Sequence, residues 1–109
     1  MILYWSWPIP ARFAGCNYGP ISFIRPEKRD DVGLAAHENT HQAQFWASPL
    51  LFPFRYCFSR QAKLAYEVEA YKAQAACYED DRLPLFAGFI SANYNLPITP
   101  EAALALLKE

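Results

Sequence analysis

The chain lacks several features that define whole classes of protein. Its formal net charge is -1, and without a basic stripe to neutralise phosphates we expect no nucleic-acid partner. No apolar run approaches the length needed to cross a bilayer, so no membrane span is expected. Internal repeats and low-complexity segments are also missing. With 109 residues, 53% of them hydrophobic, the chain is expected to form one domain over residues 1–109.

Cysteine is scarce as well. Cys16, Cys57 and Cys77 are an odd number without C-x-x-C spacing, so we expect small buried apolar side chains, with one disulfide only if the protein is exported. Residues 1–7 are apolar, but no positive residue precedes them and Arg12 interrupts the run. A signal peptide is therefore not expected.

The order of predicted elements indicates an α+β fold that is small and mainly helical, with a short β element before the first helix. Strands are predicted within residues 2–7 and over 21–25, the second bounded by glycine and proline on one side and proline on the other. Helices are predicted over residues 32–46, 60–79 and 85–93, and from Pro100 onward. Residues 50–58, which contain Pro53, are expected to form a packed connection.

What the chain does contain is one H-E-x-x-H motif, His37-Glu38-Asn39-Thr40-His41, which holds both of its histidines. On a helix capped at Asp30-Asp31, residues four apart lie on one face, so His37 and His41 could bind a single zinc ion. Glu38 would then be the general base for a water molecule at the metal. The alternative is a helix whose two histidines only form hydrogen bonds inside a small core.

A catalytic zinc needs a third protein ligand. Ala47 occupies the position where a three-histidine site would have its last histidine, and that excludes such a site. Glu67 and Glu69 of the next helix point to nearly opposite sides, so only one can reach the metal. The face through Glu69 carries mostly small apolar residues: Ala62, Ala65, Tyr66, Ala73, Ala76 and Cys77. The face through Glu67 carries Arg60, Lys63, Tyr71 and Gln74, which is typical of a solvated surface.

This pattern predicts Glu69 as a buried carboxylate that needs a strong partner, which zinc would supply. A core arginine or lysine is the alternative partner for Glu69. Glu67 is expected to be a surface residue that pairs with Lys63 or Tyr71.

These residues resemble gluzincin-type zinc metallopeptidases, in which an H-E-x-x-H helix is followed by a helix with a ligand glutamate before a small residue, here Glu69-Ala70. In its size, and in the strand predicted just before the motif helix, the chain is most similar to compact minigluzincin-like proteins. The stretches H-E-N-T-H-Q-A-Q and Y-E-V-E-A-Y-K-A-Q also resemble small H-E-x-x-H proteins, several of them phage-encoded, and the similarity covers residues 21–78. The resemblance implies a zincin-like domain, a Zn²⁺ cofactor bound by His37, His41 and Glu69, and Glu38 as base and proton shuttle.

The chain departs from larger gluzincins at two points. Ala73 stands where they often have an acidic residue that orients a ligand histidine, so Asn39, Gln44 or a backbone carbonyl must do this here. No third histidine is present to stabilise the oxyanion, so a tyrosine is expected in that role. Tyr66, three residues before Glu69, is the first choice, and Tyr71 and Tyr56 follow.

The expected function is zinc-dependent hydrolysis of peptide bonds, with strand 21–25 pairing with an extended peptide or protein substrate. The alternative is a non-catalytic binding or assembly protein, for instance in a phage particle, that keeps zinc as a structural element. A metal-free helical domain is the third hypothesis. The favoured locations are the cytoplasm or a phage particle, and the oligomeric state is not predicted.

Overall fold

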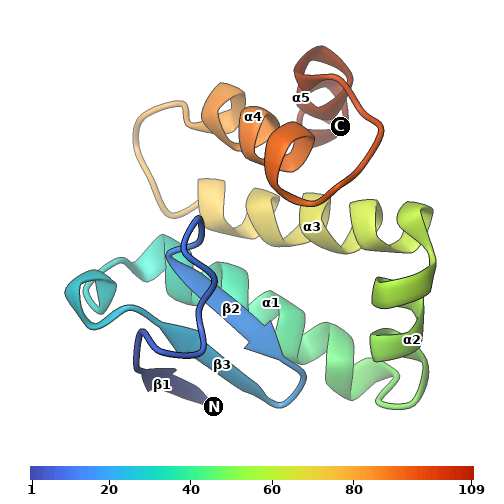
Figure 1. Cartoon of the computed structure of the whole chain (residues 1–109). Helices are drawn as coiled ribbons and strands as arrows, with labels where there is room; N and C mark the ends of the chain where they lie inside the picture. Colours follow the sequence, from blue (N-terminus) through green and yellow to red (C-terminus); the bar gives the residue numbers. More distant parts are fainter.

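Figure 1 shows the computed structural model, which describes residues 1–109 as a small sheet followed by stacked helices. The fold is α+β and mainly helical, as the sequence predicts. Its strands are β1 (Ile2–Tyr4), β2 (Gly15–Tyr18) and β3 (Ile21–Ile24), and a short 3₁₀ turn covers Pro26–Lys28. Its helices are α1 (Val32–Ala47), α2 (Leu51–Phe58), α3 (Arg60–Ala75), α4 (Leu83–Asn93) and α5 (Pro100–Leu107).

β3 is the central strand of the sheet, parallel to β1 and antiparallel to β2. A tight turn joins β2 to β3, and Gly19 has the positive φ of 81° that such a turn requires. The sequence predicts β1 and β3 but not β2, because Gly-Cys-Asn-Tyr has neither β-branched residues nor a clear alternation. β2 is therefore an edge strand that sequence patterning missed.

Side-chain caps start three helices where the sequence predicts them. Asp31 accepts a hydrogen bond from the Leu34 backbone N–H at the start of α1, and Ser59 and Thr99 do the same for α3 and α5. Residues 50–58, predicted as a packed connection and not a long helix, contain the short eight-residue helix α2. Pro53 lies in its first turn, where the missing N–H would have no helical partner in any case.

The helices form layers that leave the centre of the molecule polar. α1 lies between the sheet and α3, and α4 and α5 cover the far side of α3 (Figure 1). The apolar core is on that far side: Tyr71, Phe86, Ala87, Ile90, Leu96, Ala103 and Leu107. The buried residues of α1 are instead mostly polar, among them His37, Glu38, His41 and Gln42. The contact between α1 and α3 is therefore the place to look for function.

The cysteines do not behave as expected. Cys57 and Cys77 are exposed and Cys16 is half-buried, and no disulfide joins any of them. The expectation of small buried side chains was wrong for two of the three.

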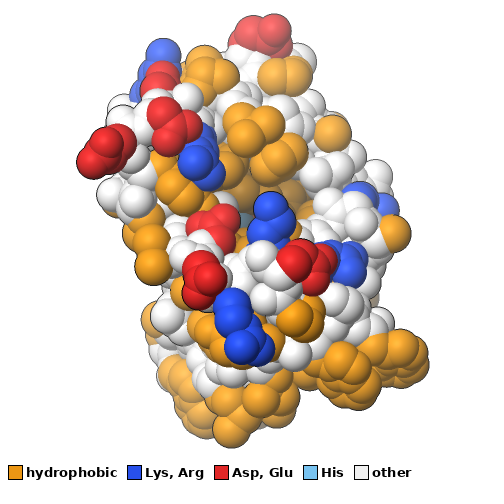
Figure 2. All heavy atoms as spheres, turned by 90° about the vertical axis from the view of Figure 1, so that its left-hand side faces the viewer, with side chains coloured by type: hydrophobic (Ala, Val, Ile, Leu, Met, Phe, Trp, Pro, Cys, Tyr) orange, Lys and Arg blue, Asp and Glu red, His pale blue; other side chains and the backbone are white.

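The surface differs in polarity from one region to another. Figure 2 shows charged side chains over the upper and middle part of one face and apolar side chains protruding along its lower edge. Among the most exposed large apolar side chains of the chain are Trp7, Leu50 and Phe58. None of the helices is both long and apolar enough to cross a bilayer.

Candidate metal centre

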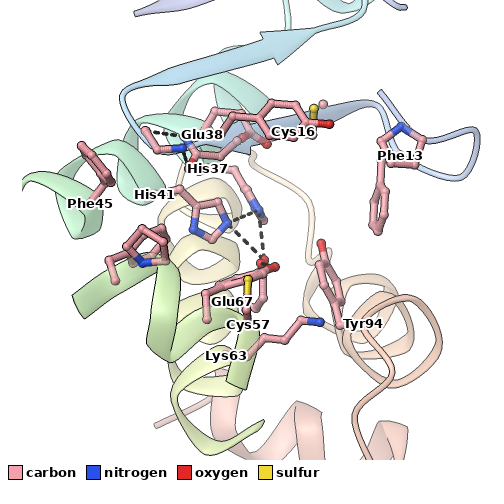
Figure 3. Close-up of a pocket in the computed structure, with 18 of the residues that line it drawn as sticks. Phe13, Cys16, His37, Glu38, His41, Phe45, Cys57, Lys63, Glu67 and Tyr94 are labelled. Atoms are coloured by element: carbon pink, nitrogen blue, oxygen red, sulfur yellow. Dashed lines mark hydrogen bonds and ion pairs between the residues drawn. The ribbon is translucent and has the colours of Figure 1, made fainter. Parts of the chain in front are cut away.

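Two imidazoles from α1 and one carboxylate from α3 converge at the centre of the molecule (Figure 3). The Nε2 atoms of His37 and His41 lie 3.2 Å apart. Glu67 Oε1 lies 3.3 Å from the first and 3.2 Å from the second. All three side chains are buried, and Glu67 is only 1% exposed. The three donor atoms thus form a nearly equilateral triangle.

This triangle has the size that a tetrahedral metal ion requires. Ligand atoms about 2.0–2.1 Å from zinc, at tetrahedral angles, are roughly 3.3 Å from one another. All three measured separations agree with that value. No fourth His, Cys, Asp or Glu joins the group, so the residues fit a metal ion with one open coordination position.

Two glutamines fix the orientation of the imidazoles. Gln44 Oε1 accepts from His41 Nδ1 at 2.8 Å, and Gln74 Oε1 accepts from His37 Nδ1 at 3.0 Å. Gln44 donates its own N–H groups to the Tyr66 carbonyl and to Glu69, so its oxygen must face His41. Both Nδ1 atoms therefore carry hydrogen, and both Nε2 atoms point at Glu67.

A second series of hydrogen bonds holds Gln74. Its side-chain N–H donates to the Tyr78 hydroxyl at 3.2 Å, and that hydroxyl donates to Asp31, the N-cap of α1. Because the Tyr78 hydroxyl is already used as a donor, Gln74 must turn its oxygen toward His37. The end of α3 thus connects the start of α1 to a ligand of the candidate metal centre.

Three lone-pair acceptors that face one another repel unless positive charge lies between them. Burial alone would lower the pKa of His41, but the Glu67 carboxylate beside it outweighs burial and raises this pKa to about 9. Burial would likewise raise the pKa of Glu67, but the adjacent imidazoles hold it well below its ordinary value. A proton on His41 Nε2 relieves the repulsion between that atom and one neighbour. A divalent cation would be bound by all three atoms and would relieve every repulsion among them.

The prediction of Glu69 as third ligand is corrected by these positions, because Glu67 occupies that place. Glu69 is exposed, and its carboxylate accepts a hydrogen bond from Gln44 at 3.0 Å. It supports the glutamine that orients His41 and does not reach the imidazole nitrogens. The expected surface pairing of Glu67 is equally wrong, since Glu67 is among the most buried residues of the chain.

The error has a physical origin in how α3 is packed. α3 buries Glu67, Ala70, Tyr71 and Gln74, a stripe with helical spacing that lies between α1 and α4. Ala65, Ala76 and Cys77 of the opposite face are exposed. Alanine has the highest helix propensity, so it also serves well on a solvated face. The 4-3-4 spacing of Glu67, Tyr71, Gln74 and Tyr78 was the signal that could have identified the buried polar face.

Glu38 lies next to this group on α1 and faces the pocket in Figure 3. It is 3% exposed, and its Oε2 is the one buried side-chain oxygen or nitrogen of the chain that has no hydrogen-bond partner. Burial raises the pKa of its carboxyl group. A buried carboxylate oxygen without a partner implies a polar molecule, such as water, in the adjoining space.

Gly15 of β2 lets the sheet approach Glu38 closely. A Cβ at this position would lie 3.0 Å from the Phe23 carbonyl oxygen and 3.3 Å from Glu38 Oε1. The edge strand and the predicted general base are therefore in direct contact.

Tyr56, and not Tyr66, is the tyrosine that binds a residue of the metal centre, although the sequence favours Tyr66 for the oxyanion role. The Tyr56 hydroxyl donates to Glu67 Oε2, and burial raises the pKa of this hydroxyl well above its ordinary value. The Tyr66 ring instead packs against Phe52, 4.8 Å between centroids, and its hydroxyl forms no hydrogen bond with a candidate ligand. Tyr71 packs edge-on against the His37 ring at 4.4 Å and gives its hydroxyl to Tyr94. The structure thus places Tyr56, and not Tyr66, at the candidate ligand carboxylate.

A pocket of about 480 Å³ opens onto the group and contains His37, His41, Glu38 and Glu67 in its wall. Its size is within the range of small-ligand sites. Comparison of the chain with protein-family models, with curated proteins and with solved structures finds no match. The geometry of the site is thus the basis for a functional proposal.

Proposed function

We propose that this protein is a zinc-dependent peptidase of the gluzincin type, with His37, His41 and Glu67 as ligands and Glu38 as general base. The observation that carries the proposal is the triangle of donor atoms with an unpartnered buried carboxylate beside it. Two imidazoles and one carboxylate with an open position are a typical donor set of catalytic zinc.

Bound zinc would supply Lewis acidity, which lowers the pKa of a water molecule and polarises a carbonyl group. The Glu38 carboxylate is a proton acceptor in the pocket wall. Burial raises its pKa, which brings it closer to the range in which an acid–base catalyst works. Gln44 and Gln74 bind the Nδ1 side of the two imidazoles, which directs both Nε2 atoms at the metal position, and Tyr56 holds Glu67 by a hydrogen bond. These groups fix the site before a substrate arrives.

The sheet favours an extended peptide as substrate, although not through the expected strand. β3 has partners on both sides, so the pairing predicted for residues 21–25 is wrong. β2 has one unpaired edge, and all its residues line the pocket. Ala14 accepts from the Arg25 backbone N–H, so the alternating pattern directs the backbone groups of Gly15 and Asn17 to the unpaired edge. A peptide could add there as a further strand.

The open coordination position speaks against the assembly alternative, in which zinc would have a structural role only. Structural zinc sites usually have four protein ligands, and the group here has three. A structural site also has no use for a buried carboxylate that lacks a partner. Both observations favour catalysis.

The substitution Glu38→Gln tests the proposal most simply. We expect zinc binding to be unchanged, because Glu38 is not a ligand, and peptide hydrolysis to fall by about 10²–10⁴-fold, because the proton acceptor is lost. Zinc content and turnover of a mixed peptide library are measured for both proteins, and Glu79→Gln on the surface serves as control. Turnover at the native rate in Glu38→Gln would overturn the role of Glu38.

The peptide library also separates the proposed function from its alternative. Wild-type protein is incubated with the library with and without a chelator, and we expect cleavage only without it. Cleavage that survives chelation would rule out metal-dependent hydrolysis. Zinc binding with no cleavage of any peptide would favour the assembly role.

A further inference from the structure

Two basic side chains in the wall of the pocket contact aromatic rings but have no carboxylate partner in the protein. Lys63 and Arg12 line the pocket, and neither forms an ion pair or a hydrogen bond with another side chain. Arg25 and Lys72, outside the pocket wall, do donate to carbonyl oxygens. Arg12 also lines a smaller pocket of about 170 Å³ that adjoins His37 and Glu38.

The Lys63 side chain has a defined position. Lys63 precedes Glu67 by four residues, so both lie on the same face of α3. Its Nζ lies 5.3 Å from the centroid of the Tyr56 ring, whose hydroxyl holds Glu67. In Figure 3 the lysine side chain extends into the pocket on the side where Tyr94 lies. Half-buried and near an aromatic ring, this ammonium group is directed toward the substrate space and not toward bulk solvent.

The charges in the pocket do not balance once a divalent metal is bound. The lining contains two carboxylates, Glu38 and Glu67, and two cations, Arg12 and Lys63, which cancel. The metal then adds about two positive charges that no side chain of the pocket offsets. Both carboxylates are already assigned to the metal centre, so the pocket favours a ligand that brings negative charge.

We propose, on the basis of the peptidase function above, that the preferred substrate is a peptide with a carboxylate close to the scissile bond, bound by Lys63 and Arg12. Four helical residues separate Lys63 from Glu67 by about 6 Å along α3. An extended peptide advances about 3.3 Å per residue, so the carboxylate lies within about two residues of the scissile bond. A free C-terminus or an aspartate or glutamate side chain provides the same group.

Binding to an inactive, zinc-loaded protein tests the inference without turnover. Glu38→Gln protein is titrated calorimetrically with four versions of one peptide: a free or amidated C-terminus, each with aspartate or asparagine near the end. We expect the peptides with a carboxylate to bind about tenfold more tightly or better than the neutral one. The two single-carboxylate peptides distinguish a terminal from a side-chain carboxylate.

Substitutions then assign the effect to the pocket. Lys63→Met, alone or with Arg12→Gln, should remove most of the preference, whereas Lys72→Met on the same helix but outside the pocket should keep it. Equal affinity for acidic and neutral peptides, no measurable binding of either, or a preference that survives the double substitution would overturn the inference. Equal cleavage of both peptides by wild-type protein would overturn it while the peptidase function stands. Failure to cleave any peptide would refute the function, and the binding preference would still decide this inference.

Discussion

The hydroxyl group of Tyr56 is the hydrogen-bond donor through which α2 supports a candidate metal ligand. It donates to Glu67 Oε2, while Glu67 Oε1 faces the two imidazoles. Outer hydrogen-bond partners of metal ligands typically contribute about 10–100-fold to metal affinity. We therefore expect Tyr56→Phe to weaken zinc binding by about tenfold or more, as measured by competition with a chromophoric chelator.

Tyr66→Phe is the matched control for this change. The Tyr66 ring packs against Phe52 and its hydroxyl forms no hydrogen bond with a ligand, so removal of the hydroxyl should leave zinc affinity unchanged. A loss of affinity in Tyr66→Phe with none in Tyr56→Phe would contradict the arrangement of tyrosines described above.

At the scale of residues, the sequence predicts the parts of the site that depend on one helix. His37, Glu38 and His41 come from a motif whose geometry follows from helical spacing alone. The third ligand depends on which face of α3 meets α1, and that is decided by packing between elements distant in sequence. Gln44 was one of three alternatives for the group that orients an imidazole, and it does bind His41. Gln74 was assigned to a solvated face and was missed.

At the scale of elements, the close packing of α1 against the end of α3 gives a further test. A Cβ at Gly33 in the first turn of α1 would lie 2.4 Å from two atoms of the Tyr78 side chain. Tyr78 connects Asp31 to Gln74, so its displacement would disturb the orientation of His37. We expect Gly33→Ala to destabilise the fold by about 1–3 kcal/mol, as overpacking does, and to weaken zinc binding.

Gly88→Ala in α4 provides the comparison, because no atom lies within 4 Å of its added Cβ. Alanine is the better helix former, so this change should stabilise the protein by about 0.5–1 kcal/mol. Both free energies of unfolding are measured by chemical denaturation. Stabilisation by Gly33→Ala of the same size as by Gly88→Ala would show that Tyr78 does not lie against α1.

Most elements were predictable because their signals are local. Capping residues and prolines mark the starts of α1, α3 and α5 within the sequence itself. β2 and α2 were missed for opposite reasons. β2 owes its pairing to β3 and carries little β propensity of its own, while the Pro53 that argued against α2 lies where a helix tolerates it.

At the scale of the whole molecule, the buried charges make stability depend on pH. In the metal-free fold His41 has a pKa of about 9, above the value of about 6.5 expected after unfolding. Its protonation therefore contributes stability that is fully present below about pH 6.5 and is lost as the pH rises through about 9. We expect the free energy of unfolding of chelator-treated protein to fall over this range, by at most about 3 kcal/mol.

Chemical denaturation at several pH values between 6 and 9 measures this loss, and His41→Gln should flatten the profile. Zinc affinity should change in the opposite direction, since the ligands must lose protons to bind metal. A metal-free stability that stays constant or increases between pH 6.5 and 9 would disagree with a carboxylate–imidazole pair at the centre of the fold.

The α+β class was predictable for the whole chain, since strand signals come first and helical signals follow. The placement of a polar centre between α1 and α3, with the apolar core displaced to α4 and α5, was not. A prediction from hydrophobic periodicity assumes that the buried face of a helix is apolar. That assumption fails where two helices bury a cluster such as His37, His41 and Glu67.

Zinc affinity of the wild-type protein, compared with Glu67→Gln and Glu69→Gln, tests the central claim most directly. The proteins are purified without an affinity tag, analysed for metal content and titrated against a chromophoric chelator. We expect one zinc per chain in the wild type, a loss of at least about 100-fold in affinity for Glu67→Gln, and less than about tenfold for Glu69→Gln. Wild-type protein that binds no zinc, or a Glu69→Gln protein that loses zinc while Glu67→Gln retains it, would contradict the account.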